Sequence, residues 1–295
     1  MLVLMYVLVQ LALIFFLYPG DMIESATVGH CFPIVCGFGI YLVCLWVFLK
    51  GMSFSGRKDM VDLYMRMGKL PAAIMLLPVL YYFIVEIALT IRAYAEILTI
   101  VFLSNTPLWA IMLLLLSVAA FLAVNGLRTV FGTAVLVACL GLPLVVFICI
   151  SSFQSVDLHY IFSLFDETFS FLKKASFYRS FFVYTGSFLF LGFVQPYYKF
   201  RMRTVWITAL CMLPLLLCSV YVPVLTFGEA TALILLFPFV VTLDVIHINW
   251  LMFERVAVFF LLSLISMTIL FLATAIWQSA RITSQFVPKI RFNYT

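Results

Sequence analysis

The sequence predicts an all-α, polytopic membrane protein. Hydrophobic residues make up 66% of the 295 residues, whereas charged residues make up only 10%. Soluble domains are about 45–50% apolar and about 25% charged, so only a chain solvated mostly by lipid tolerates this excess. The mean hydropathy is +1.23, and the apolar residues gather in runs of the length that a membrane-crossing helix requires, about 20 residues.

Eight apolar runs predict transmembrane helices within a single domain over residues 1–280. The first run resembles a secretory signal peptide in position, but it lacks a basic N-terminal region and a small-residue cleavage site, which favours a retained helix. A polar tail follows at 281–295. The eight predicted spans cover residues 1–18, 31–49, 71–103, 107–124, 130–150, 181–198, 204–226 and 254–278.

A ninth apolar stretch, 229–250, differs from these eight runs. Pro238 interrupts it, and Asp244, His247 and Asn249 make it more polar. Non-helical backbone at membrane depth is tolerated only where protein or water covers it. We therefore expect a re-entrant or surface-lying hairpin here, and Pro238 is a candidate helix break.

The basic residues support eight spans. Because cytoplasmic connections are enriched in Lys and Arg, alternate connections that are rich in them predict that both termini are cytoplasmic. A ninth span over 229–250 would place the basic tail on the opposite side. The alternate connections and the tail hold 12 of the 17 basic residues: Lys50, Arg57, Lys58, Arg66, Lys69, Arg128, Lys199, Arg201, Arg203, Arg281, Lys289 and Arg291.

The third run carries Glu86, Arg92 and Glu96 at positions where charge is costly. Glu86 lies about 22 Å along the helix from Pro71, at 1.5 Å per residue, and is therefore still inside the hydrocarbon layer. Arg92 and Glu96 are four residues apart and share a helix face. Two interpretations stay open: a structural ion pair with a neutralised Glu86, or the lining of a ligand or water pathway.

Glu254 and Arg255 begin the last predicted span at the same level as Arg92 and Glu96. They are either interfacial anchors or part of a four-charge network with those two residues.

Signatures of enzymes, cofactors and metals are missing. The chain has no GxSxG, HExxH, GxxxxGK[ST] or GxGxxG sequence, so no catalytic role and no cofactor are expected. The cysteines form no CxxC pair, so no metal site is expected. The only cluster is Cys31 and Cys36 beside His30, and these cysteines are expected to pack as small buried hydrophobic residues. The basic residues form no continuous patch, which argues against a nucleic acid partner.

The motifs around these charges resemble those of the spore germination permease family. One is Arg92-Ala93-Tyr94-Ala95-Glu96 with Thr106-Pro107, similar to the family's R-A-x-A-E…T-P pattern. A second is Phe237-Pro238 with Phe253-Glu254-Arg255, similar to its W-P…E-R-F-E region. The third is Pro196 before the basic loop 199–203.

The resemblance implies the membrane B subunit of a nutrient germinant receptor, related to amino acid–polyamine–organocation transporters. It implies a fold of two inverted five-helix repeats, with helices one and six broken around the ligand. The implied partners are membrane lipid, A- and C-type receptor subunits and a small nutrient such as an amino acid. The implied location is a bacterial cell membrane or inner spore membrane.

The chain departs from the family pattern in three places. The glycine-rich break of helix one is absent at Ala12-Leu13-Ile14, and residues 181–195 of helix six contain no acid, although Gly186 and Gly192 are candidate helix breaks. Eight predicted spans also leave the second repeat two helices short.

Three functions follow from these patterns. The first is a receptor subunit that binds a nutrient near the bilayer midplane, between helices one, three, six and the last span, with Glu86, Arg92 and Glu96 holding or coupling the pocket. The second is a secondary transporter of amino acids or polyamines. The third is a truncated, non-functional family member.

Overall fold

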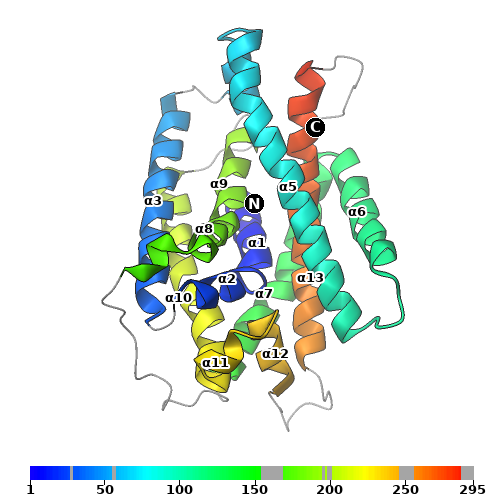
Figure 1. Ribbon diagram of the computed structural model, residues 1–295. Helices are drawn as coiled ribbons and strands as arrows, with labels where there is room; N and C mark the ends of the chain where they lie inside the picture. The colour runs from blue at the N-terminus through cyan, green and yellow to red at the C-terminus, as the bar shows by residue number, and fades with distance from the viewer. Residues whose placement is uncertain are drawn as a thin grey trace.

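The computed structural model describes residues 1–26, 29–54, 58–153, 169–194, 197, 201–245 and 256–286. Helices are the regular elements in these ranges, and no strand is found there. Figure 1 shows them as a bundle of tilted helices with short helices between some of them. The elements are α1 (Leu2–Ile14), α2 (Tyr18–Ser25), α3 (Cys31–Phe54), α4 (Met60–Met65), α5 (Lys69–Val101), α6 (Leu108–Val124), α7 (Leu127–Ser152), η3 (Ser170–Lys173), α8 (Ala175–Ser180), α9 (Phe182–Val194), α10 (Met202–Phe227), α11 (Glu229–Ala232), α12 (Pro238–Val245) and α13 (Val256–Phe286).

The chain is a multi-pass membrane protein. Six helical segments within the described ranges are long and apolar enough to cross a bilayer: α3, α5, α7, the pair α8–α9, α10 and α13. The pair α1–α2 makes a seventh if it counts as one bent span. Helix α6 has 17 residues, which is the lower limit of about 17 for spanning. Eight crossings therefore stay a prediction.

Helices α1 and α13 form the centre of the bundle. Ten of the 13 residues of α1 are buried, and α13 packs against α1, α5, α6 and α7. Figure 1 shows α1 in the interior, with α3 and α6 on opposite flanks. The outward faces of the surrounding helices carry large apolar side chains such as Trp46, Tyr81 and Leu140. Because water does not favour such faces, they are the surface that contacts lipid.

The first predicted span is broken, contrary to the expectation from Ala12-Leu13-Ile14. Helix α1 ends at Ile14, α2 begins at Tyr18, and the two axes meet at 55°. Pro19 lies in the first turn of α2. It has no backbone N–H to bond the carbonyl four residues earlier, at Phe15. A proline therefore interrupts this span at the place where the family pattern led us to expect glycines.

Several boundaries differ from the predicted ones. Helix α13 continues to Phe286, beyond the predicted end at 278, because its side chains stay partly covered by neighbours. The described part of 229–250 contains only α11 and α12, of 4 and 8 residues, and each is too short to cross a bilayer. Pro238 is the first residue of α12, where its missing N–H costs nothing.

Candidate functional site

A cavity of about 560 Å³ lies between α2, α5 and the α8–α9 pair. It is built from the second half of the broken first span and from the third and sixth predicted spans. The last predicted span was expected to contribute to the ligand pocket. Among the described lining residues of this cavity, none belongs to α13. This charged cavity is lined by Leu17, Asp21, Tyr82, Leu89, Arg92, Ala93, Glu96, Tyr178, Arg179, Phe181, Phe182 and Thr185.

Arg92 and Glu96 form the α5 wall of the charged cavity. The Arg92 Nε donates to Glu96 Oε1 at 3.0 Å, as the spacing of four residues suggests. The two side chains are 68% and 32% exposed. Exposed pairs of this kind contribute less than about 1 kcal/mol to stability. Breaking this ion pair so that each group binds a ligand therefore costs little free energy.

Arg179 forms the opposite wall and joins α8 to α2. Its guanidinium lies 2.7 Å from Glu24 Oε2 and 3.5 Å from Asp21 Oδ1. Lys174, just before α8, donates to the Glu24 carbonyl at 3.1 Å. These contacts link the second half of the broken first span to α8.

A second cavity of about 350 Å³ shares Leu17, Asp21, Ala93 and Glu96 with the charged cavity. Glu24 adds a third carboxylate, and the backbone segment 233–237 between α11 and α12 supplies an apolar wall. This adjoining cavity has no basic lining residue among those that the structure describes. The combined space is therefore charged with both signs on one side and acidic on the other.

Glu86 lies in the middle of α5, between the cavity residues Tyr82 and Leu89 in sequence. Its side chain is fully buried, and its Oε1 accepts a hydrogen bond from the Tyr82 hydroxyl at 3.1 Å. Tyr82 itself lines the cavity. Gly186 of α9 lies directly against the carboxylate, since a Cβ built there would overlap Glu86 Oε1.

The two glycines of α9 do not interrupt it. Helix α9 runs through Gly186 and Gly192, and the chain instead departs from a regular helix at Phe181, between α8 and α9. Each glycine allows a close approach: at position 192 a Cβ would lie 2.8 Å from the Phe48 ring of α3. Packing on all sides holds the helix intact, so the missing side chains serve contact rather than a break.

Three predicted site residues, Pro196, Glu254 and Arg255, lie outside the described residues, so the four-charge network stays a prediction. Sequence reasoning missed Asp21 and Arg179, which the structure places opposite Arg92 and Glu96. No spacing rule relates positions 21 and 179. The only signal was that both lie in connections predicted on the same side of the membrane.

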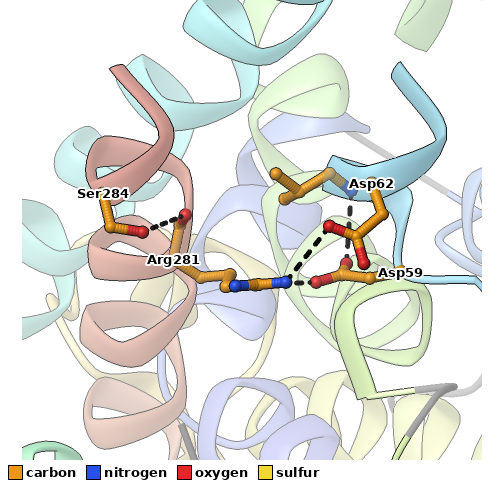
Figure 2. Close-up of polar contacts among 5 residues, drawn as sticks. Asp59, Asp62, Arg281 and Ser284 are labelled. Atoms are coloured by element: carbon orange, nitrogen blue, oxygen red, sulfur yellow. Dashed lines mark hydrogen bonds and ion pairs between the residues drawn. The ribbon is translucent and has the colours of Figure 1, made fainter. Parts of the chain in front are cut away.

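A second group of charges, shown in Figure 2, joins α13 to the connection before α4. The Arg281 guanidinium lies 2.9 Å from Asp59 Oδ2 and 3.3 Å from Asp62 Oδ1. Asp59 also caps α4, because its Oδ1 accepts the Val61 backbone N–H at 3.2 Å. The Asp59 side chain is 1% exposed. Its burial raises the pKa of the Asp59 carboxyl, although Arg281 opposes this.

Comparison with known protein families gives one match over the whole chain. A family model described as "Spore germination protein" matches residues 1–295. No curated protein matches the sequence.

Proposed function

The chain belongs to the spore germination protein family, and on that premise we propose that it is the integral membrane subunit of a nutrient germinant receptor. In this role it binds a small nutrient, such as an amino acid, and passes the signal to A- and C-type subunits by a change of conformation. With both termini in the cytoplasm, the charged cavity faces the external side of the membrane.

The charged cavity is the observation that carries this proposal. Its volume of about 560 Å³ falls within the range of about 300–1,000 Å³ that small-molecule sites occupy. It offers two guanidinium groups and two carboxylates on opposite walls, with apolar and aromatic side chains between them. A free amino acid has one carboxylate and one ammonium group, so each end finds a partner of opposite charge.

The position of these charges supports sensing by movement. Arg92 and Glu96 belong to α5, Asp21 to α2 and Arg179 to α8. A ligand that binds both walls competes with the ion pairs within each wall and adds contacts between the helices. Because a ligand shifts a conformational equilibrium only through its different affinity for two states, such bridging contacts are what a receptor requires.

Germination of spores that carry single substitutions tests the proposal. Arg92→Ala and Glu96→Ala should abolish the nutrient response, and Arg128→Ala is the matched control, because Arg128 is an exposed residue of α7 away from the cavity. Normal germination in both cavity variants, at wild-type protein levels, would contradict the proposal.

A secondary transporter of amino acids or polyamines is the second candidate. It is favoured by the interruptions at residues 15–17 and at Phe181, which lie in the first and sixth predicted spans beside the cavity. Broken helices of this kind form the ligand sites of many transporters. Uptake of a labelled amino acid into proteoliposomes separates the two functions, because a receptor binds the ligand without accumulating it.

A further inference from the structure

The Glu86 carboxyl has an environment that a permanently charged group does not tolerate. The side chain is fully buried midway along α5. Its Oε2 has no hydrogen-bond partner among the described residues, and neither has the hydroxyl of Thr90, one turn further along the same helix. An ionised carboxylate held without a counter-ion in a low-dielectric interior is strongly disfavoured.

No basic side chain of the described residues contacts Glu86. Helices α4, α6, α9 and α13 pack against α5. Helices α6 and α9 contain no charged residue, and Arg281, the only charged residue of α13, pairs instead with Asp62 of α4. The remaining charged residues of α5 are Lys69 at its start and the Arg92–Glu96 pair. Tyr184 of α9 lies two residues before Gly186, but its hydroxyl bonds to the Tyr18 hydroxyl rather than to Glu86.

The space around Glu86 is shaped for a carboxyl group and little more. Its Oε1 occupies the volume that a side chain at Gly186 would fill, and the Phe271 ring of α13 closes the same spot. A sodium or other metal ion would need several further oxygen ligands. A proton needs only one of the two carboxylate oxygens.

Tyr82 connects this buried carboxyl to the charged cavity. Its hydroxyl donates to Glu86 Oε1 at 3.1 Å and lies 3.4 Å from the Phe182 carbonyl, which is a second acceptor. Tyr82, Phe182 and the neighbouring Thr185 all line the cavity. Tyr82 thus both bonds to the buried acid and lines the charged cavity.

We propose that Glu86 is a proton-binding site that exchanges its proton with the charged cavity through the Tyr82 hydroxyl. In the uptake step the Tyr82 O–H bond breaks and its proton goes to Glu86 Oε1. A hydronium ion in the cavity gives a proton to the Tyr82 oxygen and leaves as water. The hydroxyl then donates to the Phe182 carbonyl, the carboxyl is neutral, and release runs the same step backwards.

Infrared spectroscopy of the full chain in lipid nanodiscs tests this site without any nutrient. At neutral pH, the difference between wild type and Glu86→Gln should contain the C=O band of a protonated carboxylic acid. This band should shift in deuterated buffer while the protein stays folded, and it should be lost reversibly on alkalinisation. Asp62→Asn is the control and should leave the band unchanged, because Asp62 is exposed, paired with Arg281 and not among the cavity residues.

Two results would overturn the proposal. Absence of the band at neutral pH means that Glu86 is ionised, and a band that does not shift in deuterated buffer means that the proton is sealed from the cavity. If Glu86→Gln does not fold, Tyr82→Phe replaces it, because removal of the phenol hydroxyl should change the frequency of the band and slow its deuterium shift. An unchanged frequency and rate would count equally against the link. None of these results depends on the proposed receptor function.

Discussion

Glu86 of α5 and Gly186 of α9 fit together so closely that the carboxylate occupies the place of the missing side chain. The two residues are 100 positions apart in the sequence. Their contact brings the third and sixth predicted spans together beside the charged cavity, and Tyr82, which bonds to Glu86, lines that cavity.

Gly186→Ala should therefore destabilise the protein. The added methyl group overlaps Glu86 Oε1, and overpacking of this kind costs about 1–3 kcal/mol. Thermal unfolding of the purified protein in detergent measures the effect. The double variant Glu86→Ala/Gly186→Ala should recover part of the loss, since the overlap is then absent.

Gly132→Ala is the matched control for that substitution. Gly132 also lies inside a helix, but a Cβ there meets nothing within 4 Å. Alanine at this position should leave stability unchanged or raise it by up to about 1 kcal/mol, because alanine favours helix over glycine. Equal losses in the two variants would refute a specific contact between Glu86 and Gly186.

Arg281→Ala should also lower stability, by up to about 3 kcal/mol, at the lower end of the range for broken buried ion pairs. It leaves Asp59 buried without its cation. Arg281→Lys should recover only part of this, since one ammonium group does not reproduce a guanidinium that reaches both Asp59 and Asp62. Chemical denaturation measured by tryptophan fluorescence compares the variants. An unchanged unfolding midpoint for Arg281→Ala would mean that the Arg281–Asp59 pair does not stabilise the protein.

The pH dependence of stability should report on Asp59. Burial raises its pKa in the folded protein, so the unfolded chain loses this proton first as the pH rises from about 4. The contribution of Asp59 is therefore full in acid and declines as the pH rises through the folded pKa. Asp59→Asn, which retains a capping side chain, should show a smaller decline than wild type over this range. A larger decline in the variant would contradict a raised pKa of Asp59 in the folded protein.

Arg179→Ala should weaken the ligand response with little loss of stability. The guanidinium is 57% exposed and contacts two carboxylates of α2, so its ion pairs contribute about 1 kcal/mol or less. Germination at graded nutrient concentrations should require more nutrient in the variant. Lys173→Ala, at the end of η3 and not among the cavity residues, is the control. A response identical to wild type would remove Arg179 from the site.

Local patterns in the sequence predicted much of the fold. The composition and the apolar runs predicted a helical, multi-pass membrane protein. The spacing of Arg92 and Glu96 indicated an ion pair that the structure contains. Both features depend on neighbouring residues along one helix, so a single sequence contains the information.

Features that depend on distant residues were not predicted. The bend at residues 15–17 replaces a glycine-rich turn with Pro19, and the continuation of α13 to Phe286 depends on its neighbours. Asp21 and Arg179 meet only when α2 packs against α8. Gly186 was expected to loosen its helix, but it admits a carboxylate from another helix instead.

Binding of a nutrient in the charged cavity is tested most directly by the unfolding temperature of the purified protein with each standard amino acid. A ligand that binds only the folded state raises this temperature. We predict that at least one amino acid does so for wild type and for Arg128→Ala, and that Ala93→Trp, which fills the cavity, abolishes the increase. The same increase in Ala93→Trp, or no increase with any amino acid, would contradict amino acid binding in this cavity.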